Sequence, residues 1–565
     1  MSATTAAAST SGALPQPPSL VRRIYGLGSV FGKAMRDSRR ATIVAAGLLA
    51  IVFLGVTKAI VTEFDTPQSR AEMVAIIRAV PPILQGMAGK IVDNIGTMGG
   101  YLQYKYGTFF PLILTLWSIL ALSGTLASEA QRGSLEFVAS SGLSRRRIAL
   151  QKLFGHLVPL SIALLVTFAS IAIAGQAYPV LPGDEISVGS AFAYTIWLGL
   201  IALAGGALAF ALGPFVGRGA AAGIAGFVTF AGFILSGYQQ AVPVLEPFAK
   251  LTWWGWTYNH TALSGQYDWP SVLLVGALVV ALLFVGVEAF VRRDIGITSA
   301  VPTPHVPRAL LGLGGPIGRA SAAGLGAAVW WGLGLGFFGL VMGGSSRGFI
   351  EQLQDSPQFM QLLRTVFPNV EFASAGGFLQ LLFVEFGIML AGLAAATFVS
   401  SWASDETSGR LEMVLATPLS RVRWALSGGI GMLVNVAVVV VLASLGVALG
   451  VASSDSDLAT PVTGSLILGV YAVALVGIGM AVGGVLRTAW AAPAVVIFLV
   501  ATWTLQLFGP LLGLPEAVQD LALTSHFGQT MVGVWDVGGV LAAFGVCLVG
   551  IAIGTWGLAR RDLRR

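Results

Sequence analysis

Apolar runs recur along the whole chain and are separated by short polar segments. Runs of about twenty residues cross a hydrocarbon layer as helices, so each run predicts a membrane-spanning helix. The runs fall into two groups of six. The first group comprises residues 41–60, 109–127, 148–175, 189–215, 219–238 and 271–291. The second group comprises residues 323–343, 378–400, 424–451, 464–485, 489–511 and 536–558. The predicted fold is therefore an all-α polytopic membrane protein with about 12 transmembrane helices.

The two groups resemble each other in sequence, which indicates an internal repeat. Each half also closes on Arg-Arg-Asp, at 292–294 and at 560–562. The other matching pairs are Ser128–Glu136 with Ser404–Glu412, Gly142–Arg147 with Pro418–Arg423, and Gly99–Gln103 with Gly376–Gln380. Because six is even, the repeats share one orientation in the membrane. We expect an axis along the membrane normal between them, with a transport pathway at the interface.

The repeat sets the expected domain boundaries. Residues 1–19 are rich in Ala, Ser, Thr and Pro and predict a disordered cytoplasmic tail. The first six-span half covers 20–296, a cytoplasmic linker with a short interfacial segment covers 297–318, and the second half covers 319–565. A basic amphipathic stretch precedes each group, at 20–40 and 306–319. Such stretches are typical of helices that lie in the membrane interface.

Arginines gather between alternate runs, on one predicted side of the membrane. They are Arg39, Arg40, Arg145, Arg146, Arg147, Arg218, Arg292, Arg293, Arg319, Arg421, Arg423, Arg487, Arg560 and Arg561. The opposite connections carry acids, namely Asp184, Glu185, Glu246, Asp455 and Asp457. The positive-inside rule then places both termini in the cytoplasm. The Ala-, Gly- and Val-rich, Lys-poor composition is typical of a bacterium with a GC-rich genome. The expected location of this multi-pass chain is therefore the bacterial inner membrane.

Composition changes the picture in two respects. The chain is 55% hydrophobic and 10% charged, so its net charge of +6 reflects loop arginines rather than a nucleic-acid surface. Its one cysteine, Cys547, excludes an intrachain disulfide framework. The four histidines lack metal-ligand spacing, so no metal or other cofactor is expected in this chain. They are His156, His260, His305 and His526.

No nucleotide-binding motif is evident. Gly32-Lys33 and Gly89-Lys90 lack both the spacing of the preceding glycine and the following Ser or Thr of a phosphate-binding loop. The segment Gly334–Gly339 fits GxGxxG, but it lies inside an apolar run with no strand before it. Its glycines are therefore interpreted as helix-packing positions.

The segment after the second run of each half combines charge with an apolar stripe. Spacings of three and four residues place the stripe on one helical face, as in Leu135, Val138 and Ala139. Leu411, Val414 and Leu415 repeat it. The pattern predicts a short amphipathic helix under the membrane. A helix that merely turns the chain is the structural alternative, and its duplication at equivalent positions argues for a functional role.

These segments resemble the coupling-helix signature of ABC-2-type transporter permeases. In the first half the resemblance rests on Glu129, Gly133, Leu135, Glu136, Leu143, Ser144 and Arg145. In the second half it rests on Asp405, Gly409, Leu411, Glu412, Pro418, Leu419, Ser420 and Arg421. The fused tandem arrangement is similar to permeases that export polyketide antibiotics, of the actinobacterial tetronasin type. Gly142 stands where the second half has Pro418, so we expect the helix of the first half to end less rigidly at that point.

The resemblance implies an exporter subunit without catalytic residues of its own. Its two repeated segments would dock into two copies of a separate ABC ATPase, which carries ATP and Mg. Glu136 and Glu412 would pair with basic residues of that partner or cap backbone amides, and Arg145 and Arg421 would bind the partner or lipid phosphates. The expected substrates are hydrophobic or amphipathic small molecules such as antibiotics, drugs and polyketide-like compounds.

Two further features bear on the pathway. Glu385 is the clearest acid inside a predicted span, and a lipid-facing carboxylate is costly, so it must face protein or a water-filled cavity. It is either a substrate or gate contact, or else it has a structural partner or a position at the pore mouth. Aromatic residues in the loops Gln240–Trp269 and Gly509–Trp535 could simply anchor helices at the interface, but the resemblance to ABC-2 permeases implies re-entrant helices that cap the exit. Residues 61–108 and 344–377 predict external helices.

One alternative concerns the substrate and two concern the class of protein. An ABC permease of this kind could export a lipid or glycolipid. An ion-gradient-driven secondary transporter predicts several intramembrane carboxylates, whereas only Glu385 qualifies. A polytopic membrane enzyme predicts a cluster of catalytic groups at one interface, and the sequence shows none. Neither of the last two explains the duplicated amphipathic segments.

Overall fold

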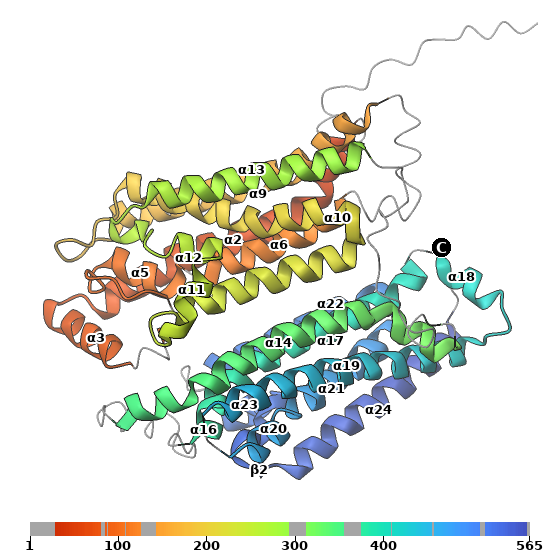
Figure 1. Cartoon of the computed structure of the whole chain (residues 1–565). Coiled ribbons are helices and arrows are strands. Elements are labelled where there is room, and N and C mark those ends of the chain that lie inside the picture. The colour runs from red at the N-terminus through yellow and green to blue at the C-terminus, as the bar shows by residue number, and fades with distance from the viewer. Residues whose placement is uncertain are drawn as a thin grey trace, which may run out of the picture.

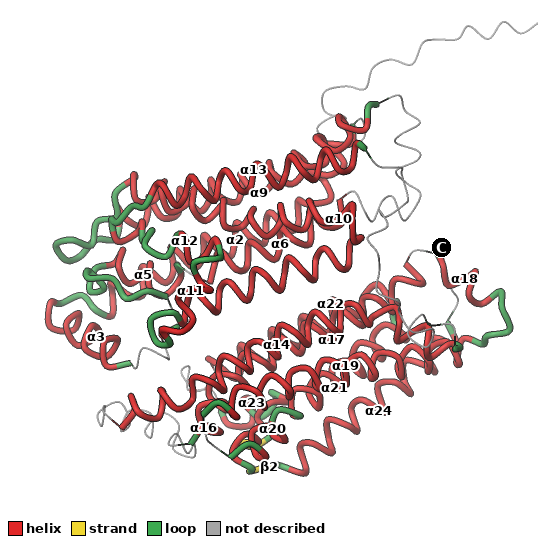
Figure 2. The backbone as a smooth tube through the Cα atoms, in the orientation of Figure 1, coloured by secondary structure: helices red, strands yellow, loops and turns green. Residues whose placement is uncertain are grey.

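The structure is a computed structural model that describes most of the chain. The described residues are 29–80, 85–86, 89–107, 109–125, 143–292, 312, 314–354, 374–407, 409–454, 457–508 and 515–561. Helices account for nearly all of the regular structure in these ranges. Loops gather at the two ends of the helices, as Figure 2 shows. The predicted all-α class is confirmed.

The first half runs from α2 to α13. Its α-helices are α2 (Val30–Glu63), α3 (Pro67–Ala79), α5 (Met98–Tyr106), α6 (Phe109–Thr125), α9 (Arg145–Ala177), α10 (Val188–Tyr238), α11 (Glu246–Ala249), α12 (Trp253–Trp256) and α13 (Trp269–Val291). Its short 3-10 helices are η1 (Pro243–Leu245) and η2 (Ala262–Ser264). Helices α3 and α5 lie in the segment where external helices are expected.

The second half runs from α14 to α24. Its α-helices are α14 (Pro316–Gln354), α16 (Ala375–Leu379), α17 (Glu385–Thr407), α18 (Arg410–Leu415), α19 (Arg421–Ala452), α20 (Ala459–Gly464), α21 (Ile467–Val485), α22 (Ala491–Phe508), α23 (Glu516–Gln519) and α24 (Val537–Arg560). A π-helix, η4 (Gln380–Val384), joins α16 to α17. The 3-10 helices are η5 (Thr488–Trp490), η6 (Leu523–His526) and η7 (Thr530–Val532), and strands β1 (Gly528–Gln529) and β2 (Val534–Trp535) pair antiparallel.

Among the described residues, nine helices are long and apolar enough to cross a membrane, or ten if the bent pair α5 and α6 counts as one span. Helix α10 contains two of the predicted runs, 189–215 and 219–238, and breaks between them at Gly217 (φ 79°, ψ 172°). Only glycine adopts such a conformation readily. Helix α22 covers the run predicted at 489–511 but is shorter. The expected total of 12 spans therefore stays a prediction.

The two halves lie side by side, and the axes of their long helices are roughly aligned (Figure 1). We call one end of the molecule the basic end, because α9 and α19 begin there at Arg145 and Arg421 and α24 finishes there at Arg560. Helix α18 and the described C-terminal residues lie at this end (Figure 1). Helices α3, α5, α11, α12, α16 and α20 lie at the other end, which we call the opposite end.

The described part of the first amphipathic stretch, residues 30–40, is continuous with the first span in α2. At 1.5 Å per residue, its 34 residues exceed what a layer of about 30 Å requires, so α2 extends beyond the apolar run. The tail 1–19 and most of the linker 297–318 lie outside the described residues.

The internal repeat is visible in matching contacts at the opposite end. In the first half Gln103 Oε1 accepts a hydrogen bond of 3.2 Å from the backbone N–H of Leu263. In the second half Gln380 Oε1 accepts one of 3.1 Å from the N–H of Met531. Each repeated Gly-Gly-x-Leu-Gln segment therefore holds the aromatic loop of its own half.

Glycine allows the same close approach in both halves. A Cβ at Gly99 would lie 2.2 Å from the carbonyl oxygen of Leu263, and a Cβ at Gly376 would lie 2.2 Å from that of Met531. Trp253 and Trp254 of the first aromatic loop are buried, at 6% and 4% exposure. Buried rings of this kind favour the predicted cap over simple interfacial anchoring.

Aromatic side chains join the two halves where the second arm of α10 packs on α14. Phe227 lies 6.0 Å from Trp330 and 6.1 Å from Phe337 between ring centroids. Phe230 lies 5.9 Å from Phe338. Edge-to-face pairs such as Phe230–Phe338 add to the packing energy. The halves are therefore in direct side-chain contact along this seam.

Helices α14 and α19 pack closely through glycines. A Cβ at Gly446 would lie 1.9 Å from the carbonyl oxygen of Gly336, and a Cβ at Gly339 would lie 2.8 Å from the Val447 side chain. Gly336 and Gly339 belong to the GxGxxG segment, so their interpretation as helix-packing glycines is confirmed. Gly334 of the same segment has open space around its Cβ position.

A buried ion pair closes the opposite end of the first half. Arg70 Nη1 and Nη2 donate to the two carboxylate oxygens of Asp184 at 2.7 and 3.1 Å. The side chains are only 6% and 1% exposed. Arg70 also donates to the carbonyls of Phe64 and Gly96. This pair thus ties α3 to the loop between α9 and α10.

Burial alone would raise the pKa of Asp184, but hydrogen bonds from Arg70 and from the backbone N–H groups of Leu181 and Met98 outweigh it. Together with the positive charge of Arg70, they hold the pKa of Asp184 below its ordinary value of 3.8. The carboxylate is therefore ionised in the folded protein at neutral pH. Its interactions stabilise the fold wherever the pH lies above that ordinary value.

We predict that Gly446→Ala destabilises the second half, because the added methyl must push α19 away from α14. Overpacking of this kind costs about 1–3 kcal/mol. The measurement is the apparent melting temperature of the purified chain in detergent, which should fall by several degrees. Gly334→Ala is the control, since its site is open and alanine favours a helix over glycine by about 1 kcal/mol. Equal melting temperatures for the two variants would contradict the close packing.

We predict that Asp184→Asn lowers thermal stability at neutral pH, because it leaves the buried Arg70 without its counter-ion. Breaking a buried pair typically costs about 3–5 kcal/mol. The loss should be constant above about pH 5 and should shrink as the pH falls through the lowered pKa, where the wild-type carboxylate itself protonates. Melting curves at several pH values measure this. Asp65→Asn, at an exposed site, is the control, and a pH-independent difference between Asp184→Asn and wild type would refute the linkage.

Candidate functional site

The predicted coupling segment of the second half forms a short helix at the basic end. Gly409 adopts a left-handed conformation (φ 74°) and starts α18. Leu411 is buried at 2% exposure, and Val414 and Leu415 pack against the core. Glu412 is exposed on the other face. The predicted amphipathic helix is present, with its charged face directed away from the protein.

The Ser-Arg pairs after the coupling segments begin the next spans. The Ser420 side chain accepts from the Arg423 N–H at 3.2 Å, and the Ser144 side chain accepts from the Arg147 N–H at 3.3 Å. Both serines are therefore N-caps, a role that stabilises a helix start by about 1 kcal/mol. This repeated capping gives a structural reason for part of the motif.

The remaining predicted residues of the second copy differ in their contacts and in their exposure. Arg421 Nη1 donates to the carbonyl oxygen of Arg561 at 2.9 Å, so this arginine ties α19 to the end of α24. Pro418 is exposed and Leu419 is half-buried, in the turn before α19. The structure does not test binding of Arg421 to a partner or to lipid.

In the first copy, Leu143 packs against a cluster that includes Leu122 and Phe290, and Arg145 is the first residue of α9. The rest of the first copy lies outside the described residues. The residues concerned are Glu129, Gly133, Leu135 and Glu136. Their roles stay predictions from the repeat.

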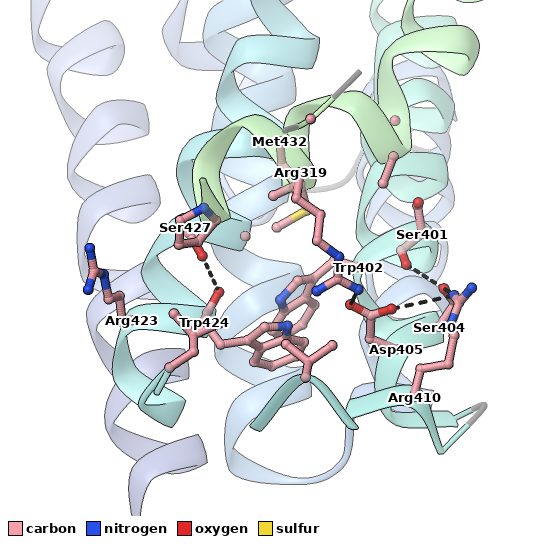
Figure 3. A pocket seen from close by; sticks show the side chains of 18 of the residues that line it. Arg319, Ser401, Trp402, Ser404, Asp405, Arg410, Arg423, Trp424, Ser427 and Met432 are labelled. Carbon is pink, nitrogen blue, oxygen red and sulfur yellow. Dashed lines mark hydrogen bonds and ion pairs between the residues drawn. The ribbon is translucent and has the colours of Figure 1, made fainter. Parts of the chain in front are cut away.

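Asp405 joins the coupling segment to α14. Its carboxylate contacts Arg319 of α14 at 3.2 Å and Arg410 of α18 at 3.4 Å. Arg410 also donates to the Ser404 hydroxyl at 3.0 Å. Figure 3 shows both guanidinium groups directed at the Asp405 carboxylate. One carboxylate thus links three helices at the basic end, since Asp405 itself belongs to α17.

Glu406, the neighbouring residue, forms a second link that the sequence reasoning missed. It accepts hydrogen bonds from Arg561 of the closing Arg-Arg-Asp motif and, at 2.7 Å, from Thr488 of η5. Arg561 also donates to the carbonyl of Leu486 at 3.1 Å. The repeated Arg-Arg-Asp motif was the sequence feature that could have led to this contact, but the sequence did not identify the acidic partner of Arg561.

A cavity of about 1150 Å³ lies between α14, α17, α18 and α19 at the basic end. Its apolar wall includes Phe398, Trp402, Trp424 and Met432. Figure 3 shows the Trp402 and Trp424 rings beside the Arg319–Asp405 pair. Pockets of roughly 300–1,000 Å³ hold drug-sized molecules, so this one is large enough for a small ligand.

Glu385 begins α17 directly after the π-helix η4. Both of its carboxylate oxygens accept from Gln506 Nε2, at 3.1 Å each. Gln506 in turn accepts from the hydroxyl of Thr524 in the aromatic loop. Glu385 therefore has the structural partner that was one of its two expected roles, and this chain of bonds ties α17 to α22 and to the cap.

The histidines have separate local contacts. His156 contacts the Ser118 hydroxyl at 3.1 Å. His260 Nδ1 accepts from the Asp268 N–H at 3.0 Å, and burial lowers the pKa of its ring. Within the described ranges, no group of three or more His, Cys, Asp or Glu side chains is arranged to hold a metal ion.

Comparison with known proteins agrees with a transport role. A family model described as Multidrug efflux system permease Rv1217c, C-terminal domain, matches residues 313–558. The chain is also 26% identical over 530 residues to the multidrug efflux system permease protein Rv1217c of Mycobacterium tuberculosis (strain ATCC 25618 / H37Rv). That alignment covers 91% of this chain and 90% of the relative. Together with the long apolar helices, this similarity supports a multi-pass membrane permease related to efflux systems.

We predict that Glu385→Ala lowers the apparent melting temperature, because Gln506 then loses its acceptor inside the protein. An unsatisfied buried polar group costs about 1–3 kcal/mol. Fluorescence-detected gel filtration after heating measures the shift. Glu351→Ala is the control, since Glu351 is exposed and forms an ion pair across one helical turn with Arg347. Normal stability with lost transport would instead make Glu385 a pathway contact.

Proposed function

We propose that the chain is the membrane subunit of an ABC exporter whose ATP is hydrolysed by a separate ATPase subunit. The observation that carries this proposal is α18, a charged amphipathic helix held under the spans at the basic end. A membrane domain of this kind receives mechanical work only through such cytoplasmic contacts. Two ATPase copies, each with ATP and Mg, would bind α18 and the equivalent segment of the first half.

The contacts around α18 suit the transmission of force. Asp405 connects α17 to Arg410 of α18 and to Arg319 of α14. Glu406 connects the end of α17 to Arg561, next to the end of α24. A displacement of α18 therefore acts on several helices of the half together. Exposed Glu412 and Met413 (67% exposed) provide a polar and an apolar contact for the partner.

The substrates we propose are hydrophobic or amphipathic small molecules, including drugs and polyketide-like antibiotics. Support comes from the similarity to a multidrug efflux permease and from the apolar character of the spans. The tandem, tetronasin-exporter type of ABC-2 permease is the corresponding subfamily. Export of a lipid or glycolipid is the second candidate, because the cavity at the basic end combines an apolar wall with charged groups.

The basic end is assigned to the cytoplasm of a bacterial cell by the positive-inside rule. Both termini then lie in the cytoplasm, and the aromatic loops cap the outer end. This orientation places α18 where an ATPase has access. It also places the Arg70–Asp184 pair on the outside.

We predict that Glu136→Ala combined with Glu412→Ala weakens ATPase binding, because each acid contacts a basic residue of the partner. Loss of a buried interfacial charge pair costs about 2–5 kcal/mol, so co-purification with the ATPase should drop at least tenfold. The tagged chain is co-expressed with the ATPase encoded beside its gene, and both binding and ATP hydrolysis are measured.

Glu246→Ala combined with Glu351→Ala is the matched control, since both acids are exposed on the opposite end. This control should retain full binding. If the wild-type chain purifies without any ATPase and an ion gradient alone drives transport in vesicles, the chain is a secondary transporter and the proposal is rejected.

A further inference from the structure

The cavity at the basic end is lined by buried side chains and is open on one side. Its wall side chains Phe398, Trp424 and Met432 are at most 5% exposed, yet they border an open volume of about 1150 Å³. Voids in a well-packed interior are rarely larger than a water molecule. A cavity this large and this apolar is suited to a small molecule.

The apolar wall indicates what part of a ligand it would hold. Trp402 and Trp424 stack with ring centroids 5.3 Å apart and planes inclined by 21°. The pair presents indole surface beside Phe398 and Met432. Surfaces of this kind bind flat aromatic or aliphatic groups through dispersion and area burial.

Two buried polar atoms on the cavity wall lack partners within the described chain. They are the Asn435 side-chain oxygen, on a residue 1% exposed, and the Trp402 Nε1–H. The amide nitrogen of Asn435 lies against α14, where a Cβ at Gly324 would be 2.2 Å away. Buried polar groups usually have a hydrogen-bond partner, so an unpaired acceptor and donor on one cavity wall point to a ligand.

The mouth of the cavity carries an excess of positive charge. Arg319 and Arg410 share the single carboxylate of Asp405, so the three groups together have a net charge of +1. Each guanidinium has five N–H donors, and its hydrogen bonds to other described residues use only some of them. The remaining donors suit a carboxylate, sulfonate or phosphate group.

From these observations we infer that the cavity binds an amphipathic anion, with its apolar body on Trp402 and Trp424 and its acidic group at Arg319 and Arg410. The ligand enters from the basic end, where those arginines are about half exposed (47% and 55%). Two sources share this chemistry, an anionic lipid headgroup and a soluble acidic cargo molecule.

The same cavity borders the proposed ATPase contact. Met413 and Val414 of α18 and Thr417 beyond it line the wall. A bound ligand therefore touches the helix that receives the force. This expectation rests on the proposed function: ligand binding in the cavity should favour binding of the ATPase and increase ATP hydrolysis.

The test compares two probes with one ring system, anionic 8-anilino-1-naphthalenesulfonate and neutral N-phenyl-1-naphthylamine. The full chain is reconstituted in phosphatidylcholine nanodiscs, and energy transfer from tryptophan to each probe is titrated against empty discs. Arg319→Gln should weaken the sulfonate about tenfold relative to the neutral probe, equivalent to about 1.4 kcal/mol. Asp405→Asn should strengthen it, because a competing carboxylate is removed.

Further variants separate the site from the rest of the chain. Ala323→Phe fills the cavity and should weaken both probes, and Arg347→Gln, on α14 at the opposite end, should change neither. The ratio of the two affinities does not depend on the fraction of folded protein. The inference is overturned if Arg319→Gln and Asp405→Asn leave this ratio unchanged, or if Ala323→Phe leaves both affinities unchanged.

Two additional experiments identify the source of the ligand and test whether its binding affects ATP hydrolysis. Phosphatidylglycerol in the discs displaces the sulfonate from wild type if a lipid occupies the site, and fails to displace it if a soluble cargo does. With the ATPase bound, the sulfonate should raise ATP hydrolysis in wild type but not in Ala323→Phe. Probe binding without any ATPase association would reject the proposed function and keep the site. ATPase association without probe binding would reject the ligand site and keep the proposed function.

Discussion

Helices surrounded by lipid gain little from apolar burial, because lipid tails are as apolar as the side chains they would replace. Their association depends on close contact, which small residues permit. Gly336 and Gly446 bring α14 and α19 together, and Gly477 and Gly550 do the same for α21 and α24, where an added Cβ on either glycine would meet backbone atoms within 2.7 Å. The rigid placement of the polar groups at both ends follows from this packing.

Polar contacts divide between the two ends according to their surroundings. At the opposite end, Arg70 and Asp184 are almost fully buried and each is satisfied by several hydrogen bonds. At the basic end, the groups around Asp405 are partly exposed and two arginines share one acid. The first arrangement favours a single fixed structure, whereas the second leaves donors available to other molecules.

Much of the fold follows from local sequence. The run predicted at 148–175 became α9 (Arg145–Ala177), and the stripe of Leu411, Val414 and Leu415 became the inner face of α18. The two predicted runs 189–215 and 219–238 became the two arms of α10, which Gly217 separates, but the backbone angles of Gly217 that turn the chain could not be read from the sequence. Likewise Glu406 and Arg561 are 155 residues apart, and they meet only because α17 and α24 both pack against α21. Sequence periodicity identifies a helix face, but it does not identify the polar partner that the face will meet.

Glu385 occurs in the second half, whereas the first half has Thr108 or Phe109 at the equivalent place. If two separate identical subunits took the place of the two halves, each residue would be present twice. A side chain that suited one subunit would then also occur in the other. A gene fusion removes that restriction. The link from Glu385 through Gln506 to Thr524 lies within the second half alone. The two halves of this chain are thus free to diverge into unequal roles, one acquiring polar ties that its twin never has to accommodate.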